Sequence, residues 1–230
     1  MIKTIKLIFI LAIPLFLLIG PIRFIASDSY LKFEYGKSDF PPDPFGFTIS
    51  QRMKIASENL RFVRDNLPLD ALSSQVFEGD PVYNSRELGH MLDVQKVYQS
   101  VWSGWQLIVL FIILTGSLLW RLKGRLSLLS AIQAGGLLTS GLIFALGLFA
   151  IVAWQVWFTA FHQIFFQPGS WTFEYSDTLI RLFPEKFWFD SALSLLSFGF
   201  IEGLLVALLG SHWKLILQKK IKKDRNRLSV

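Results

Sequence analysis

The sequence predicts a membrane all-α fold, a bundle of four transmembrane helices with both termini in the cytoplasm and a small mixed extracytoplasmic cap. Three observations support this fold class. Apolar residues make up 52% of the chain and charged residues only 17%, whereas a soluble domain carries about 25% charge. Apolar runs approach the ~20 residues that a spanning helix needs. The segments between them alternate between basic and acidic, as expected when Lys and Arg stay on the cytoplasmic side.

Four apolar runs are the candidate spans: Leu7–Ile22, Val101–Trp120, Leu126–Phe161 and Ser191–Leu209. The third is too long for one helix, yet two crossings there would place the basic C-terminal segment outside. We therefore expect residues 126–133 to lie at the membrane interface, a break at Gly135-Gly136, and a span from Leu137 to Trp157. The fourth run is interrupted only by Glu202, which we expect to be a neutral, structural carboxyl bonded to Thr139 or Ser140.

The distribution of charge sets the expected orientation. Thirteen of the 23 Lys and Arg residues lie in or beside the spans, including Lys3, Lys6, three in the RLKGR segment and seven from Lys214 onward. By contrast, Asp28–Lys96 holds eleven acids and eight bases, and Glu174–Asp190 holds four acids and two bases. Basic residues beside apolar spans determine topology, so we expect no nucleic-acid partner, and membrane lipids as partners of the basic tail.

These arguments divide the chain into eight segments. They are transmembrane helix 1 (1–26), the extracytoplasmic cap (27–97), helix 2 (98–120), a cytoplasmic loop (121–125), an interfacial lead with helix 3 (126–161), an extracytoplasmic aromatic loop (162–188), helix 4 (189–213) and a basic cytoplasmic tail (214–230). The first span also resembles a signal peptide, but its roughly 16 apolar residues exceed a usual signal core, so we expect a retained anchor. The expected location is the plasma membrane.

Local patterns predict the elements of the cap. Ser29–Tyr35 alternates loosely and favours a strand. Apolar residues recur every three or four positions from Ile49 to Leu67, which predicts an amphipathic helix that Thr48 caps and that ends before Pro68. A second helix is expected to begin near Ser85 and to run without a break into the second span.

Topology sorts the three histidines. His212 lies at the cytoplasmic end of the fourth span, where an interfacial, structural role is expected. His90 and His162, 72 residues apart, are both expected at the outer membrane boundary. A boundary histidine can simply bond a headgroup or a carbonyl, but imidazole also exchanges protons near neutral pH. Glu87 and Asp93 lie one turn either side of His90, where a carboxylate can fix the tautomer of an imidazole.

The sequence offers few other catalytic groups. It has no cysteine, no GxSxG nucleophile elbow and no metal-binding spacing such as HExxH, so we expect no cofactor and proton transfer without an enzyme nucleophile. Residues 154–189 hold 13 of the 35 aromatic side chains. An interfacial aromatic belt accounts for part of this set, and its density favours a pocket that grips acyl chains.

Two motifs carry a family resemblance. YNSRELGHMLDV, followed by FHQIFFQPGSWTFEYSDTLIRLFPEKFW, resembles the lipoprotein intramolecular transacylases, formerly an uncharacterised integral membrane family. The resemblance extends over nearly the whole chain. It implies four transmembrane helices with an extracellular cap. It also implies transfer of the sn-2 acyl chain of a diacylglyceryl lipoprotein to the α-amino group of its N-terminal cysteine, which gives the lyso-form.

The resemblance also implies roles for residues. The two catalytic histidines of the family fall on His90 and His162. We assign His162 as base, because it lies within the aromatic loop, and His90 as assistant, an order that the sequence leaves open. The expected supporting residues are Asn84, Glu87 and Asp93. The expected substrate pocket is Trp157, Phe158, Phe161, Phe165, Phe166, Trp171, Phe173 and Arg181. Two alternatives remain open at this point: a non-catalytic membrane protein whose cap binds a lipid or protein partner, and a metal-dependent hydrolase.

Overall fold

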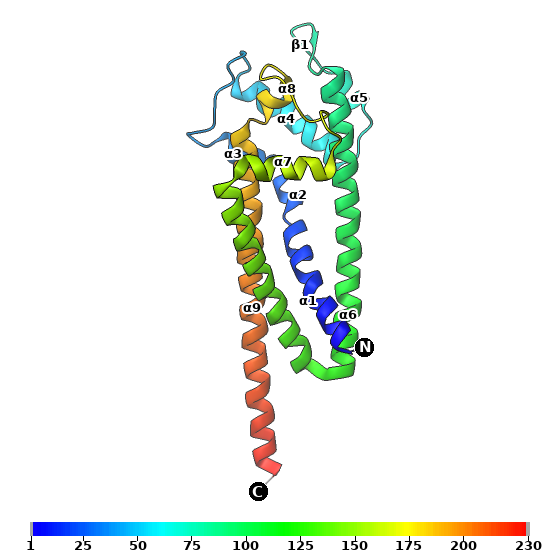
Figure 1. The fold of residues 1–230 in the computed structure, drawn as a ribbon, viewed down its shortest axis with the longest axis vertical. Coiled ribbons are helices and arrows are strands. Elements are labelled where there is room, and N and C mark those ends of the chain that lie inside the picture. The colour runs from blue at the N-terminus through cyan, green and yellow to red at the C-terminus, as the bar shows by residue number, and fades with distance from the viewer. Residues whose placement is uncertain (1, 229–230) are drawn as a thin grey trace. The chain divides into compact units, whose positions relative to one another are not determined.

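The computed structural model describes residues 2–228, which are mostly helical and include one short β-hairpin (Figure 1). In chain order the elements are α1 (Ile2–Ile19), α2 (Ile22–Ile25), α3 (Asp28–Tyr35), α4 (Ile49–Arg64), α5 (Asp70–Ser73), β1 (Val76–Phe77), β2 (Asp80–Pro81), α6 (Ser85–Val152), α7 (Trp154–Phe165), α8 (Thr178–Leu182) and α9 (Glu185–Leu228). The strands pair antiparallel through a two-residue loop.

Among residues 2–228, three helical stretches are long and apolar enough to cross a membrane: Ile2–Ile25, Ser85–Val152 and Glu185–Arg227. The second stretch changes direction at Gly124, whose φ of 75° and ψ of 175° are not helical. Glycine adopts a positive φ without a Cβ clash, so the RLKGR segment turns there and α6 consists of two arms. The chain therefore has the helical, membrane-type architecture that its composition predicts.

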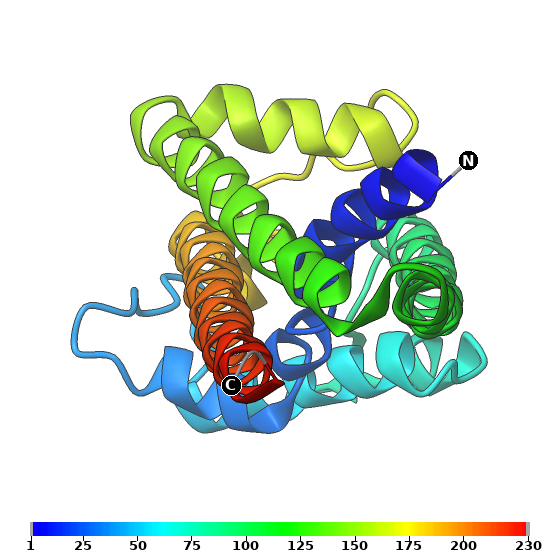
Figure 2. The ribbon, with the colours of Figure 1, turned by 90° about the horizontal axis from the view of Figure 1, so that it is seen from below.

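The chain forms two compact units. The first comprises the chain up to Pro21, Gly104–Leu148, and the part of α9 from Leu196 onward. Its buried side chains are Phe9, Ile13 and Leu17 of α1 with Leu119 and Ala131 of α6. Figure 2, a view along these helices, shows α1 beside α6.

A glycine pair brings helices of the first unit into close contact. A Cβ at Gly136 would lie 2.5 Å from the backbone of both Gly203 and Ala207 in α9, and one at Gly135 would overlap Ile13. Small residues at such positions let helices approach closely in a membrane. The expected break at Gly135-Gly136 is therefore wrong, because packing keeps the helix continuous through both glycines.

The helix instead ends much later. Ala153, with φ −134° and ψ 49°, separates α6 from α7, so the expected span to Trp157 stops at Val152. The expected hydroxyl partners of Glu202 are also engaged elsewhere. Thr139 donates to its own helix at Gly135, and the Ser140 hydroxyl lies 3.2 Å from the carbonyl oxygens of Gly136 and Phe200.

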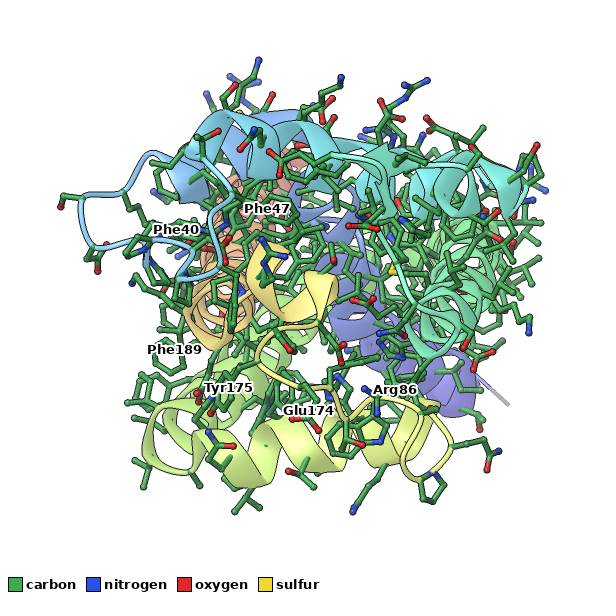
Figure 3. All side chains as sticks on the ribbon, turned by 90° about the horizontal axis from the view of Figure 1, so that it is seen from above. Phe40, Phe47, Arg86, Glu174, Tyr175 and Phe189 are labelled. Atoms are coloured by element: carbon green, nitrogen blue, oxygen red, sulfur yellow. The ribbon has the colours of Figure 1, made fainter. Side chains whose placement is uncertain are left out.

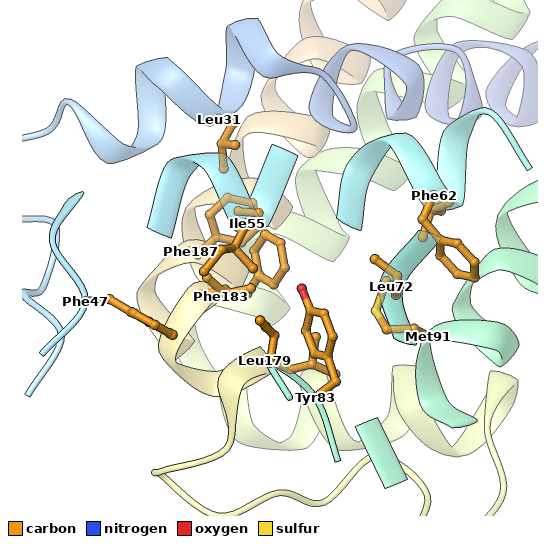
Figure 4. Packing of buried hydrophobic residues seen from close by; sticks show 14 of the residues in the cluster. Leu31, Phe47, Ile55, Phe62, Leu72, Tyr83, Met91, Leu179, Phe183 and Phe187 are labelled. Carbon is orange, nitrogen blue, oxygen red and sulfur yellow. The ribbon is translucent and has the colours of Figure 1, made fainter. Parts of the chain in front are cut away.

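The second unit, Ile22–Ser103 with Phe149–Leu195, has its own hydrophobic core. Figure 4 shows side chains from several helices meeting there, among them Leu31 of α3, Ile55 of α4, Met91 of α6, Leu179 of α8 and Phe187 of α9. One buried polar side chain of this unit bonds to backbone. Gln95 of α6 donates to the carbonyl oxygens of Phe62 and Leu67, both at 2.8 Å, and so satisfies the end of α4.

The elements of this unit agree with the local patterns except at one place. Thr48 and Gln51 form a capping box at the start of α4, and the helix ends at Arg64, four residues before Pro68. The expected strand at Ser29–Tyr35 is wrong, because this segment is helix α3. Ser27 caps that helix, and its buried residues Tyr30, Leu31, Glu34 and Tyr35 follow helical spacing on one face.

Candidate functional site

The first turn of α6 is held by a capping box that also fastens α8. The side chain of Asn84 accepts hydrogen bonds from the backbone N–H groups of Arg86 and Glu87, both at 3.0 Å. The Glu87 carboxylate is 1% exposed and accepts from the N–H of Asn84 at 2.9 Å and of Leu179 at 2.8 Å. Asn84 and Glu87 therefore fix the start of the helix that carries His90, and their role in orienting that ring stays a prediction.

Two other expected site residues also have partners away from the histidines. Asp93 forms an ion pair with Lys96 at 3.2 Å. Arg181 donates to Asp43 from two nitrogens, at 3.2 and 2.9 Å, and its guanidinium lies 3.6 Å from the ring centroid of Phe47. Arg181 therefore anchors the loop before α4, and its place in an acyl pocket stays a prediction.

His90 lies at the end of the second turn of α6, against aromatic side chains. Its ring centroid is 4.9 Å from that of Phe166 and 5.3 Å from that of Phe173, both edge to face. Its Nδ1 is buried and has no hydrogen-bond partner within the described part of the chain. This imidazole is therefore held by ring contacts and keeps its hydrogen-bonding capacity for another molecule.

His162 lies on α7, and its backbone contact defines its tautomer. Nδ1 is 2.8 Å from the carbonyl oxygen of Phe158, one turn earlier. A carbonyl only accepts hydrogen bonds, so Nδ1 carries the proton and the lone pair of the neutral ring is on Nε2. The ring centroids of Phe158 and Trp171 lie 4.1 and 4.7 Å away. The helix thus presents an imidazole that is fixed in one tautomer, in an aromatic setting.

Phe166 brings the two histidines into one cluster. Its ring centroid is 4.9 Å from that of His90 and 5.6 Å from that of His162. Both histidines belong to the second unit, although they come from different helices and are far apart in sequence. We call His90, Phe158, His162, Phe166, Trp171 and Phe173 the histidine cluster.

The loop after α7, which carries Trp171 and Phe173, is fastened to the start of α6 through Asp177. Asp177 accepts from Arg86 at 2.8 Å and from the side-chain amide of Asn84 at 2.9 Å. Arg86 also lies 5.5 Å from the centroid of Phe173. Figure 3 shows Arg86 next to this loop. These contacts hold the loop over the histidines.

Burial changes the proton affinity of both imidazoles, which lie outside the apolar runs Val101–Trp120 and Leu126–Phe161. Desolvation lowers the pKa of His162 below its ordinary value, although the bond to Phe158 acts in the opposite direction. Desolvation also lowers the pKa of His90, and the charge that His162 would carry adds to this effect. Both rings are consequently neutral near pH 7, the state in which an imidazole can accept a proton.

Comparison with known proteins identifies the family of this site. The model of the family described as lipoprotein intramolecular transacylase Lit matches residues 7–188. The chain belongs to the lipoprotein intramolecular transacylase family. An uncharacterised protein of Aquifex aeolicus (strain VF5) is 30% identical over 226 residues, which cover 97% of this chain and 98% of that protein.

Solved structures share the fold of this transacylase family member. The in meso structure of the membrane integral lipoprotein intramolecular transacylase Lit from Bacillus cereus superposes with a TM-score of 0.77 at 18% identity, covering 96% of this chain and 98% of that one. A histidine-to-arginine variant of the same protein gives a TM-score of 0.72 at 18% identity, over 96% and 95% of the two chains. At this identity the likeness establishes a common fold.

The remaining aromatic residues expected in the pocket form a ladder along α7 of this transacylase family member. Trp157 stacks on Phe161 at 5.9 Å, and Phe161 contacts Phe165 at 5.0 Å. Phe161 also touches the ring of His162 at 5.4 Å, so the ladder adjoins the histidine cluster. Trp154, which sequence reasoning did not include, extends the ladder through a stack on Trp157 at 5.4 Å.

Sequence reasoning also missed Arg86 and Asp177 as parts of the site. A signal for Arg86 was present, because it precedes His90 by four residues and so shares its helix face. Nothing in the sequence indicated that Asp177 would be its partner, since 91 residues separate the two.

Proposed function

We propose that this chain is a lipoprotein intramolecular transacylase that moves the sn-2 acyl chain of a diacylglyceryl lipoprotein to the α-amino group of its N-terminal cysteine. Membership of the family supports this activity. The single observation that supports the mechanism is that the ring of Phe166 contacts the rings of both His90 and His162. Lipoprotein and membrane lipid are the partners of the proposed reaction.

The proposed topology has four crossings. Gly124 divides α6 into two arms, and each arm contains an apolar run that can span once. The basic termini and the RLKGR turn face the cytoplasm under the positive-inside rule, so the second unit faces the extracytoplasmic side. This orientation would place the histidine cluster where a lipoprotein anchored in the outer leaflet carries its modified cysteine.

The proposed reaction needs only proton management, because ester and amine belong to one substrate. The amine nitrogen attacks the ester carbonyl carbon, a C–N bond forms, and the C–O bond to the glycerol breaks. Nε2 of His162 accepts the proton that the nitrogen loses, and that proton ends on the departing glycerol oxygen with the assistance of His90. The aromatic walls hold the reacting groups together and exclude water, which makes the encounter effectively unimolecular.

Substitution of each histidine tests the proposal. Purified protein would be given a defined diacylglyceryl lipopeptide, and mass spectrometry would follow the lyso-form after mild ester hydrolysis, since only an N-acyl chain survives that treatment. His90→Ala and His162→Ala should each lower turnover by roughly 10²-fold or more. His212→Ala is the matched control, because that exposed ring lies in the other unit and should leave turnover unchanged.

A thermal melt of each variant in the same detergent separates lost chemistry from lost folding. Wild-type turnover by both His90→Ala and His162→Ala would exclude the proposed mechanism. Absence of conversion by the wild-type protein, with folding intact, would exclude the proposed activity.

A further inference from the structure

The histidine cluster contains a buried hydrogen-bond donor that the fold leaves unused. Within residues 2–228 the indole Nε1 of Trp171 is buried and has no acceptor. An indole N–H can only donate, and a buried donor without a partner costs about 1–3 kcal/mol. The fold therefore tolerates an N–H that a bound molecule could satisfy.

A second tryptophan of the same unit provides an internal comparison. Trp154 Nε1 is also buried without a partner. Its ring, however, packs on Trp157, Phe158 and Phe189, and none of its ring contacts is with an imidazole in the described part of the chain. The Trp171 ring lies 4.7 Å from that of His162. Of these two unused indole donors, only that of Trp171 belongs to a ring in contact with the proposed base.

Acyl transfer needs such a donor. When the amine attacks, the electron pair of the ester C=O bond moves to the carbonyl oxygen, which becomes an anion. The histidines are already assigned to the proton that moves from nitrogen to the glycerol oxygen, so neither is free to stay on this oxygen throughout. A fixed N–H in a water-poor site stabilises such an oxygen far more than it would in water.

Resting on the proposed transacylase function, we propose that Nε1–H of Trp171 hydrogen-bonds the carbonyl oxygen of the scissile sn-2 ester and stabilises the oxyanion that forms on it. Two features support this assignment. The loop that carries Trp171 is fastened to the start of α6 by Asp177, so the indole is pre-positioned. The contact with His162 places the indole ring beside the imidazole that, in the proposed reaction, accepts the proton of the attacking amine.

The test removes the N–H and keeps the ring. Trp171→Phe should lower kcat by about 10²-fold, the effect of losing one oxyanion donor, with KM changed less than about 3-fold. Replacement of Trp171 by β-(3-benzothienyl)alanine, in which sulfur stands for the N–H, should lower kcat equally and retain the size of the indole. Trp154→Phe is the comparison variant and should lower kcat less than Trp171→Phe does, because within the described part of the chain its ring contacts are with Trp157, Phe158 and Phe189 and none is with a histidine.

A thionoester substrate separates a direct role of Trp171 from a structural one, because only a direct hydrogen bond to the carbonyl oxygen makes the effect of Trp171→Phe depend on replacing that oxygen by sulfur. Sulfur is a weaker hydrogen-bond acceptor than oxygen, so the analogue should slow the wild-type protein more than it slows Trp171→Phe. If the wild-type protein converts the lipopeptide and both Trp171 variants convert it at the same kcat, the role of Trp171 is excluded and the proposed function is not. That role is also excluded if both substitutions reduce kcat only in proportion to folded protein. If the wild-type protein makes no lyso-form, the proposed function fails, and this inference with it.

Discussion

Two sets of buried polar groups lie within a few turns of each other in the second unit, and they differ in whether the fold satisfies them. In the first set, Glu87 accepts from two backbone N–H groups, and Thr178 donates to the carbonyl oxygen of Val82 at 2.5 Å. In the second set, the histidine cluster, Nδ1 of His90 and Nε1 of Trp171 are buried without partners in the part of the chain that the structure describes.

A missing partner is not by itself a sign of function, because Trp154 Nε1 is also unpaired within the described residues. We use it together with contact to a histidine ring to separate the site from the framework. A buried polar group whose partners come from the backbone is explained by folding alone. A buried donor or acceptor that folding leaves unused destabilises the protein, and it gains a partner only when another molecule arrives. We therefore assign the Glu87 set to the framework and the histidine cluster to the site. The predictions below test this division, from the largest expected effect to the smallest.

Removal of the Glu87 carboxylate should destabilise the protein without changing its chemistry. Glu87→Ala leaves the N–H groups of Asn84 and Leu179 without an acceptor, so the free energy of unfolding should fall by about 3 kcal/mol. His90→Phe keeps the ring contacts and should change that energy by less than about 1 kcal/mol while lowering turnover. Denaturant unfolding and turnover per folded molecule measure the two effects. Equal stability losses in the two variants would contradict the division.

The Arg181–Asp43 pair should likewise belong to the framework. The Asp43 side chain is fully buried, and Arg181→Ala would leave its carboxylate without its cation. The free energy of unfolding should fall by about 2 kcal/mol, while KM for the lipopeptide per folded molecule stays at the wild-type value. Asp43→Asn in the Arg181→Ala background should then cost less than it does alone. A raised KM with unchanged stability would return Arg181 to the substrate pocket.

The sequence allows the framework to be predicted wherever a local rule decides. The cap at Thr48 and the start of α6 follow from residue types and spacing, and both are found. The helix at Ser29–Tyr35 was missed because a short alternating segment fits both periodicities, and burial against α4 decides between them. Whether Gly135-Gly136 breaks the helix or allows close packing depends on which helix lies against the two glycines. The local sequence does not contain that information.

The site could be predicted in part for a similar reason. Span length and charge placed His90 and His162 at one expected boundary, and the structure brings them into one aromatic cluster. The partners of the neighbouring charged residues were not predictable, because Arg86 meets Asp177 and Arg181 meets Asp43 through contacts between distant segments. A carboxylate one turn from a histidine in the sequence therefore did not reveal which donors that carboxylate would bind.

The pH dependence of stability should depend on His90. Its pKa is lowered by burial, so the unfolded chain binds more protons than the folded one between the lowered value and about 6.5. Stability gained from the neutral ring is present above pH 6.5 and is lost as the pH falls below it. The melting temperature of wild type should therefore drop by several degrees more between pH 7 and pH 5 than that of His90→Phe. Identical drops in the two proteins would show that this imidazole does not titrate with a lowered pKa.

The smallest effect is expected for Asp93, which lies one turn after His90 on α6. Its carboxylate pairs with Lys96, and both side chains are exposed, at 39% and 72%. An exposed pair of this kind contributes about 0–1 kcal/mol. Burial lowers the pKa of His90, and the charge of Asp93 opposes only a part of this lowering. Asp93→Asn should therefore leave melting temperature within about 1 °C of wild type and turnover within about 2-fold. A 10-fold loss of turnover at unchanged stability would mean that Asp93 orients the imidazole during the reaction. In that case a carboxylate could act on His90 during the reaction even though it forms no hydrogen bond with that ring in the unbound protein.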